Sequence, residues 1–374
     1  MLSQFDDYPI HQVAQPIRQV ATSDRNFYDR YYFNCYSPEA DLFLIVGLGQ
    51  YPNLGVADGF AVARRGDDHI VVRVSKALGA DRADTAVGPL RVEVVEGLRV
   101  LRVVLEPGNG DVAFDLTFTG NMPAHEEARH HRRHLERVVI DTTRFVQTGT
   151  WTGTVEIDGE SRAVAGWRGN RDRSWGIRPV GEAEPPGRRA AAGLQNFFWI
   201  YAVMQFDDFS VFTIMQEDER GRRIVEEAVR IWPDADREPE WLGRSEHRLE
   251  FAPGTRDVTA ATLCFRKPSG DVEVRCSLRL ANYIGIDTGY GLEPDWRHGM
   301  WQGDLVVQSR RKRVSSIDPG LRLFCPVDHL ADFEWREDGR ISYGTGLFEV
   351  GVIGPHDRYG FTSFTDTAKG VSEK

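Results

Sequence analysis

The chain of 374 residues has only four cysteines, and no pair of them has the C-x-x-C spacing. We therefore interpret Cys35, Cys264, Cys276 and Cys325 as reduced core residues rather than as a disulfide framework or a zinc site. No apolar run is long enough to span a bilayer, and the N-terminus lacks the pattern of a signal peptide. These absences predict a cytoplasmic protein without a transmembrane segment.

Positive charge is also scarce. Lysine and arginine number 46 against 56 aspartate and glutamate residues, which gives a formal net charge of -10. Binding to nucleic acid or to an anionic membrane needs a basic face, so we expect neither as the main partner. The one basic run, residues 310–313, follows an alternating apolar stretch and is interpreted as a solvated strand end.

Familiar catalytic and metal motifs are missing as well. The chain has no G-x-S-x-G elbow and no H-E-x-x-H helix motif. The segment "GLGQYPNLG" lacks the spacing of a phosphate loop and is interpreted as a turn at a strand end. The best helix candidate, residues 124–139, carries His130 and His134 among four arginines, so we favour a solvated charged segment over a metal site. We expect no cofactor.

What the sequence does have is alternation with a period of two. In "DVAFDLTFTG", Val112, Phe114, Leu116 and Phe118 share one face, which is typical of a half-buried antiparallel strand. Asp158-Gly159 separates two alternating runs and predicts a tight hairpin. With 41% hydrophobic residues and 37 glycines, the chain predicts an all-β class with little helix, built as barrels or sandwiches.

A linker divides the chain into nearly equal halves. Residues 180–193, "VGEAEPPGRRAAAG", combine prolines, charges and small residues without periodicity. We therefore predict an N-terminal domain over residues 1–185 and a C-terminal domain over residues 186–374, each with its own barrel. The segment "GNRDRSWGIRP", residues 169–179, lies immediately before this linker, where a ligand site is often found.

That segment is unusually rich in charge. Arg171 and Arg173 flank Asp172 and would keep it ionised if they contact it. Trp175 could form an apolar wall or a cation–π face. Two interpretations stay open: the floor of an apolar pocket, or a salt-bridge knot between domains with Trp175 as a packing plug. Likewise, the aromatic run around Tyr31 suits either a pocket lining or a first barrel strand.

"GNRDRSWGIRP", preceded by "RFVQTGTWTGTVEIDGESRAVAGW" and followed by "FFWIYAVMQFDDF", resembles the carotenoid 1,2-hydratase (hydroxyneurosporene synthase) and AttH-like superfamily. Proteins of that superfamily are similar to two lipocalin-like β-barrels in one chain, with a signature close to G-x-R-D-H-S-W-G-x-R. The match carries over Arg171, Asp172, Ser174, Trp175, Gly176 and Arg178. It fails at Arg173, where the family usually has a histidine.

The resemblance implies two lipocalin-like antiparallel β-barrels and a cofactor-free lyase or isomerase of the hydratase, dehydratase or cyclase type. The implied ligand is a hydrophobic terpenoid, steroid or polyketide-like small molecule. Since arginine does not release its proton near neutral pH, we assign the proton transfer to Asp172, Tyr201 or Asp207. The candidate substrate-binding residues are Arg171, Arg173, Trp175, Arg178, Trp199 and Tyr31.

Two other functions remain open. A lipocalin-like carrier could hold a hydrophobic ligand in a barrel and bind its carboxylate or phosphate head group with arginines. A structural interaction protein is the third alternative. The sequence identifies no particular ligand and leaves a homodimer open.

Overall fold

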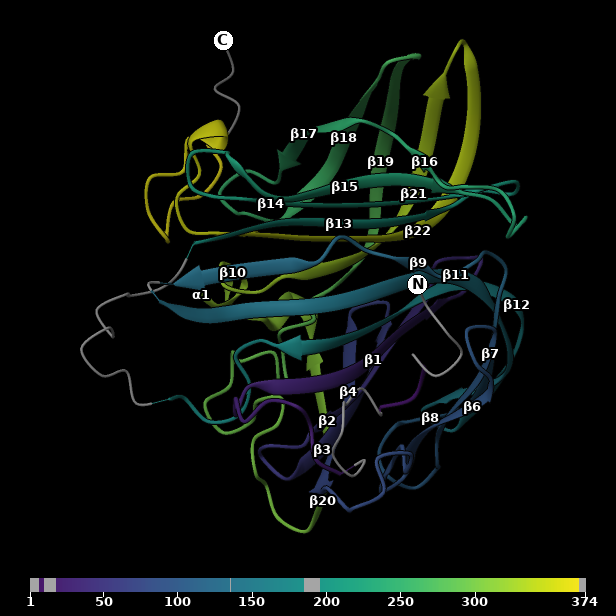
Figure 1. The fold of residues 1–374 in the computed structure, drawn as a ribbon, viewed down its shortest axis with the longest axis vertical. Coiled ribbons are helices and arrows are strands. Elements are labelled where there is room, and N and C mark those ends of the chain that lie inside the picture. Colours follow the sequence, from purple (N-terminus) through teal and green to yellow (C-terminus); the bar gives the residue numbers. More distant parts are fainter. Residues whose placement is uncertain (1–6, 10–17, 135, 185–195, 370–374) are drawn as a thin grey trace. The chain divides into compact units, whose positions relative to one another are not determined.

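The computed structural model describes residues 7–9, 18–134, 136–184 and 196–369. The protein is all-β, as predicted (Figure 1). Within the described ranges the only α-helix is the four-residue α1 (Pro319–Arg322), beside the short 3-10 turns η3 (Val314–Ser316) and η4 (Asp357–Tyr359). Helical structure in these ranges is nowhere long and apolar enough to cross a membrane.

The chain forms two compact units. The first unit comprises Met1–Ala183 together with Ile286–Val314, and the second comprises Glu184–Gly285 together with Ser315–Lys374. The predicted division at residues 185/186 does not include the return of Ile286–Val314 to the first unit. That return supplies a loop and a strand to the first unit.

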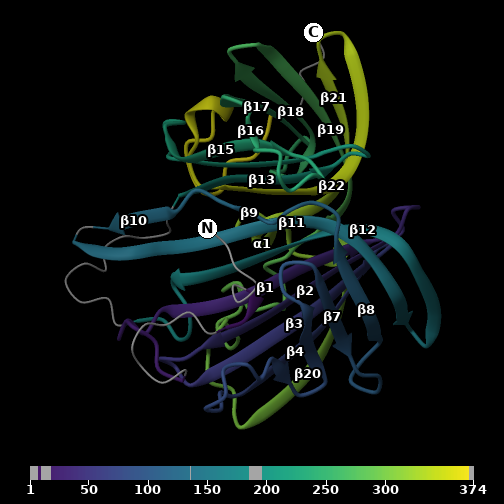
Figure 2. The ribbon, with the colours of Figure 1, turned by 45° about the vertical axis from the view of Figure 1, so that its right-hand side comes forward.

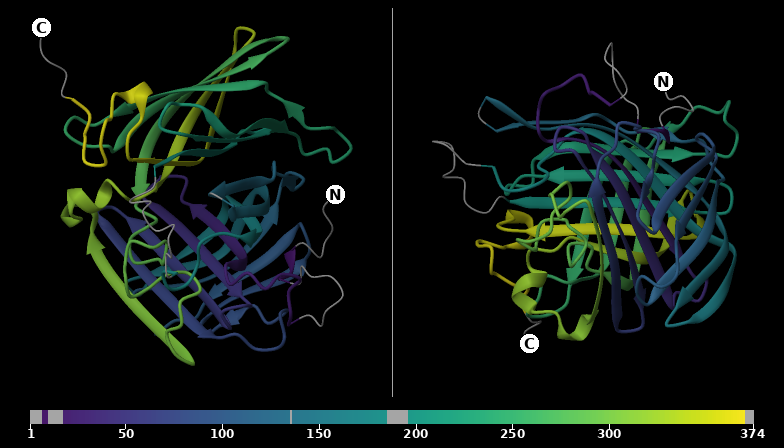
Figure 3. Two further views of the ribbon diagram at one scale, coloured as in Figure 1. Left: turned by 60° about the vertical axis from the view of Figure 1, so that its left-hand side comes forward. Right: turned by 90° about the horizontal axis from the view of Figure 1, so that it is seen from below.

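The first unit is a nearly closed antiparallel barrel. Its strands follow the spatial order β20-β4-β3-β2-β1-β12-β11-β8-β7-β6-β5, with β9 and β10 paired to β11. Figure 2 shows β1 to β4 side by side, and the left view of Figure 3 shows β20, in light green, along the edge of the sheet. The strands are β1 (Phe27–Tyr36), β2 (Leu42–Tyr51), β3 (Val56–Arg65), β4 (Asp68–Ala77), β5 (Ala86–Val87), β6 (Leu90–Glu96), β7 (Val100–Leu105), β8 (Val112–Gly120), β9 (His125–Glu126), β10 (His130–His134), β11 (Arg137–Ile157), β12 (Glu160–Ile177) and β20 (Leu305–Arg313).

Alternation along the strands fills the barrel. Val112, Phe114, Leu116 and Phe118 of β8 all belong to the core, as their spacing predicts. Trp151 of β11 completes the centre, with its ring 5.1 Å from that of Phe118. The free volume beside these side chains is only about 10 Å³, so the interior is packed.

Local sequence signals were correct at two turns and wrong at the helix candidate. Asp158 and Gly159 have φ of 56° and 77°, which is the tight turn predicted between β11 and β12. Residues 124–139 were the helix candidate, but they form β9, β10 and the start of β11, because pairing along β11 outweighs local helical spacing. The segment "GLGQYPNLG" is a turn at a strand end, as predicted, because β2 ends at Tyr51 and residues 52–55 form the turn before β3.

The second unit is a curled antiparallel sheet with the order β16-β15-β14-β13-β22-β21-β19-β18-β17, which forms a half-barrel. Its core gathers around Phe198, Phe265, Trp335 and Phe348. The strands are β13 (Phe197–Gln205), β14 (Ser210–Glu217), β15 (Arg223–Ile231), β16 (Glu240–Trp241), β17 (Arg244–Phe251), β18 (Val258–Lys267), β19 (Gly270–Asn282), β21 (Val327–Glu337) and β22 (Arg340–Ile353).

Candidate functional site

Strand alternation separates the residues of the "GNRDRSWGIRP" motif into two sets. The motif forms the second half of β12, which pairs with β1 so that Arg173 lies opposite Tyr31 and Asp172 opposite Tyr32. Neighbouring side chains on a strand point to opposite faces of the sheet. Arg171 and Arg173 therefore point into the barrel, whereas Asp172 lies on its outer face.

The inward arginines bind aspartates that are distant in sequence. Arg171 pairs with Asp7. Arg173 pairs with Asp29, and its guanidinium lies 4.2 Å from the ring centre of Tyr31. All of these side chains are buried. The expectation that Arg171 and Arg173 clamp Asp172 is therefore wrong, because alternation turns Asp172 away from both of them.

On the outer face of the same strands, two glycines leave a trough for the side chains of neighbouring residues. Gly47 and Gly49 of β2 lie beside Arg30 of β1. A Cβ on Gly49 would lie 2.6 Å from Cγ of Arg30 and 2.7 Å from the Tyr51 hydroxyl, and a Cβ on Gly47 would lie 2.5 Å from the Phe60 ring. Only glycine leaves room for these neighbours, so the glycine pair in "GLGQY" makes the space in which Arg30 and Tyr51 meet.

Arg30, Tyr51 and Asp58 form a hydrogen-bonded chain in that trough. Nη1 of Arg30 donates to the Tyr51 hydroxyl at 2.8 Å, and this hydroxyl donates to Oδ1 of Asp58 at 3.0 Å. The backbone N–H of Gly299 donates to the other carboxyl oxygen of Asp58 at 2.6 Å. Asp58 is 2% exposed and Tyr51 is completely buried. The trough therefore holds a connected acid, phenol and guanidinium.

The covering loop, residues 286–304, closes this cluster. Gly299 has φ of 79°, and a Cβ there would lie 2.8 Å from the Tyr51 ring. His298 hydrogen-bonds through Nε2 to the Thr288 carbonyl at 3.0 Å and through Nδ1 to Nη2 of Arg178 at 3.2 Å. Because a carbonyl only accepts, Nε2 carries the proton and Nδ1 accepts from Arg178. His298 is therefore neutral in this arrangement.

Aromatic rings lie beside the two arginines of the cluster, Arg30 and Arg178. The Arg178 guanidinium lies 4.6 Å from the ring centre of Tyr28, and the Arg30 guanidinium lies 5.7 Å from that of Tyr290. Tyr290 also meets the His298 ring edge-on, with the ring centres 4.4 Å apart. Tyr290 is 37% exposed and Arg178 is half-buried. These two residues are therefore the most exposed members of the cluster.

Burial shifts the pKa of Asp58, Tyr51 and His298. Burial raises the pKa of Asp58, although Arg30 and the hydrogen bonds from Gly299 and Tyr51 oppose the rise. Burial also raises the pKa of Tyr51 well above its usual value. The pKa of His298 falls well below its usual value, because burial is reinforced by Arg30 and Arg178. A carboxyl that holds its proton more tightly beside a neutral imidazole is typical of acid–base sites.

Three other predicted site residues lie in the second unit or at its surface. Tyr201 and Trp199 of β13 are buried on the face of the sheet opposite the second unit's core. Tyr201 lies directly opposite Glu349 of β22. Asp207 is exposed in the turn after β13, six residues and therefore roughly 20 Å of strand from Tyr201. The structure thus does not bring Asp207 and Tyr201 together.

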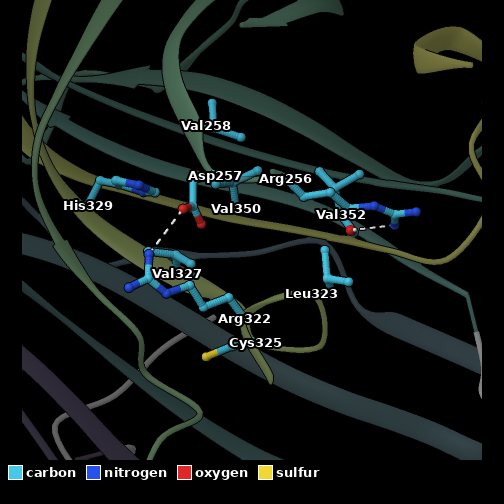
Figure 4. A pocket seen from close by; sticks show the side chains of 10 residues that line it. All are labelled: Arg256, Asp257, Val258, Arg322, Leu323, Cys325, Val327, His329, Val350 and Val352. Carbon is cyan, nitrogen blue, oxygen red and sulfur yellow. Dashed lines mark hydrogen bonds and ion pairs between the residues drawn. The ribbon is translucent and has the colours of Figure 1, made fainter. Parts of the chain in front are cut away.

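The second unit also has a small polar pocket, shown in Figure 4. Asp257 accepts from the Tyr283 hydroxyl at 3.1 Å and from Nη1 of Arg322 at 3.3 Å, and His329 and Cys325 also line the pocket. Its free volume is about 20 Å³, which suits a water molecule rather than a terpenoid or polyketide. No group of three or more histidine, cysteine or acidic side chains in the described ranges is arranged to hold a metal.

The sequence interpretation included Arg178 and Asp172 of the outer face, but it missed Arg30, Tyr51 and Asp58. Two signals pointed towards them. Arg30 stands inside the aromatic run of β1, and the spaced glycines of "GLGQY" precede Tyr51 within one strand. The missing step was the recognition that glycines on one face of a strand leave room for large side chains of its neighbours.

Solved structures with the same fold are distant in sequence. A protein from Nitrosomonas europaea given the name AttH is 12% identical with a TM-score of 0.53, over 89% of this chain and 95% of that one. Kievitone hydratase from Nectria haematococca is 14% identical with a TM-score of 0.53, over 92% and 94%. CghA is 12% identical with a TM-score of 0.50, over 92% and 95%. The protein thus has the AttH-like fold that the resemblance implied.

The family assignment is more specific. A family model matches residues 2–362, so the chain belongs to the family of unknown function DUF8625. A search of curated proteins finds no match.

Proposed function

We propose that this protein is a cofactor-free lyase or isomerase of the hydratase, dehydratase or cyclase type, and that Asp58 is its proton donor. The observation that carries the proposal is the buried chain from Arg30 through Tyr51 to Asp58. Burial raises the pKa of Asp58, so its carboxyl keeps a proton at a higher pH than an exposed aspartate. Such a group is suited to general acid catalysis.

The charges of the cluster favour an oxygenated substrate. Arg30 and Arg178 are cations, Asp58 is the acidic partner, and His298 is neutral. Positive charge opposes a carbocation but stabilises the negative charge that builds on a carbonyl oxygen when water adds to the conjugated alkene, before Asp58 protonates the carbon. A hydrophobic substrate with a carbonyl or phenolic oxygen, such as a polyketide-like or oxygenated terpenoid compound, fits this arrangement better than a pure hydrocarbon.

The aromatic residues would bind the apolar part of such a substrate. Tyr290 and Tyr28 present rings beside the two guanidinium groups, and Arg178 is only half-buried. Asp172 lies on this outer face and is a further candidate for ligand contact. Kievitone hydratase shares the fold, and its name supports a reaction of the hydratase class.

The test combines ligand screening with reaction in heavy water. Wild-type protein, Asp58→Asn and Tyr51→Phe are incubated in D₂O with a panel of oxygenated polyketide-like and terpenoid alkenes. Ligand binding is followed by thermal shift, and products by mass spectrometry for gain or loss of water and for deuterium. We expect Asp58→Asn to keep ligand binding and to lose turnover by about 10²–10⁴-fold. The wild-type rate should fall as the pH rises through the elevated pKa of Asp58.

Asp115→Asn is the matched control, because it removes a partly exposed carboxylate of the same unit that pairs with Arg102. It should leave turnover unchanged. Full turnover by Asp58→Asn would refute the assignment of the proton donor. Binding by the wild-type protein without any chemical change across the panel would instead favour the carrier function.

A further inference from the structure

The end of the first barrel at the β6–β7 turn contains an anion site. The side-chain carboxylate of Asp7 occupies this site. Both Nη atoms of Arg171 contact it, with Nη2 at 3.3 Å from Oδ2. The backbone N–H of Leu98, in the turn between β6 and β7, donates to Oδ2 as well. Asp7 and Arg171 are completely buried. A bidentate guanidinium with an added N–H is the usual receptor for a carboxylate.

The groups that receive the carboxylate hold one another in place without Asp7. Gln147 of β11 accepts from Nε of Arg171 at 2.9 Å and donates to the Leu98 carbonyl at 2.8 Å. The Gln147 amide thus orients both groups that donate to the carboxylate, the Arg171 guanidinium and the Leu98 backbone. Leu98 has φ of 60°, a conformation that is costly for leucine and turns its N–H towards the site. The receptor is therefore built into the barrel.

The charge balance of the site also depends on the carboxylate of Asp7. Arg82, Arg171 and Arg173 are buried at this end of the barrel, and Asp29 pairs with two of them, Arg82 and Arg173. Asp7 supplies the only carboxylate seen on Arg171 among the described residues. Without it, a buried guanidinium would lose its ion pair, which is strongly unfavourable.

From these contacts we infer that the barrel end at the β6–β7 turn is a carboxylate-binding site in which Asp7 acts as an internal ligand. The site takes a compact free carboxylate, of the size of formate or acetate, when the Asp7 side chain is removed. It prefers a carboxylate to chloride, because the two guanidinium N–H groups and the Leu98 N–H match a planar anion with two oxygens.

Chemical rescue of Asp7→Ala tests this inference in the full chain. Melting is measured in sodium chloride and in sodium acetate or formate at equal ionic strength. We expect Asp7→Ala to melt on the order of 5–10 °C below the wild type in chloride, because a buried ion pair is broken. Acetate or formate should restore at least half of that loss in a saturable manner, and it should shift the wild type very little.

Two variants make the result specific. Asp7→Asn fills the site with a carboxamide, so it should melt lower than the wild type without being rescued. Asp271→Ala removes a half-exposed carboxylate that pairs with Arg266, and it should respond to acetate like the wild type. Equal effects of acetate on all variants, or wild-type melting of Asp7→Ala, would overturn the inference. If Asp7→Ala does not fold in chloride, refolding from urea should recover more soluble protein in acetate, and equal recovery in both salts would also overturn it.

Discussion

Substitution of Gly49 by alanine offers a direct test of the trough that holds the Arg30–Tyr51 contact. The added Cβ would lie 2.6 Å from Cγ of Arg30 and 2.7 Å from the Tyr51 hydroxyl, roughly 1 Å closer than ordinary contact. Neither neighbour is a loose side-chain end. Cγ of Arg30 lies near the backbone, and the Tyr51 hydroxyl is held by hydrogen bonds to Arg30 and Asp58.

Something must therefore move, and overpacking of this kind costs about 1–3 kcal/mol. The φ of Gly49 is not in the left-handed region, so the cost arises from crowding rather than from backbone strain. We expect Gly49→Ala to lower the free energy of urea unfolding by that amount. If the cluster is the active site, turnover should also fall, because the Arg30–Tyr51 hydrogen bond is displaced.

Gly79→Ala is the matched control. A Cβ on Gly79 meets nothing within 4 Å, and its φ is not positive either. This variant should unfold like the wild type or be slightly more stable, since alanine restricts the unfolded chain. If the free energies of unfolding of Gly49→Ala and Gly79→Ala differ by less than about 0.5 kcal/mol, the argument that Gly49 lies in a crowded trough is wrong.

Three further predictions concern stability. Trp151→Ala should cost about 3–5 kcal/mol in urea unfolding because Trp151 is buried, whereas Trp241→Ala should cost little because Trp241 is 64% exposed. Trp175 is only half-buried, so Trp175→Ala should destabilise the protein less than Trp151→Ala, and an equal loss would contradict this placement. Burial lowers the pKa of His69 and of His329 to about 4, below the unfolded value near 6.5. The unfolded state therefore binds more protons as the pH falls from 6.5 towards 4, and each histidine should cost up to about 3 kcal/mol of stability there. Unfolding of His69→Gln at neutral and acidic pH should show a weaker loss than the wild type, and an identical pH profile would refute the argument.

The motif before the linker shows where sequence reasoning reached its limit. The charged composition of residues 169–179 suggested a pocket floor or a salt-bridge knot between domains, whereas Arg171 and Arg173 form buried ion pairs within the first unit. Its assignment as one pocket floor treated neighbouring residues as neighbours in space. In a strand they are not, because successive side chains alternate between faces. The inward arginines meet Asp7 and Asp29, and the outward side carries Asp172.

The sequence by itself determined the all-β class, because alternation with a period of two and the Asp158-Gly159 turn are local properties of the chain. Its central motif also led to the AttH-like fold. Only the tertiary structure decided which residues meet. Asp58 and Gly299 are 241 positions apart, and they touch because the chain returns to the first unit after residue 285. Such pairings depend on strand order and register, which no local pattern encodes.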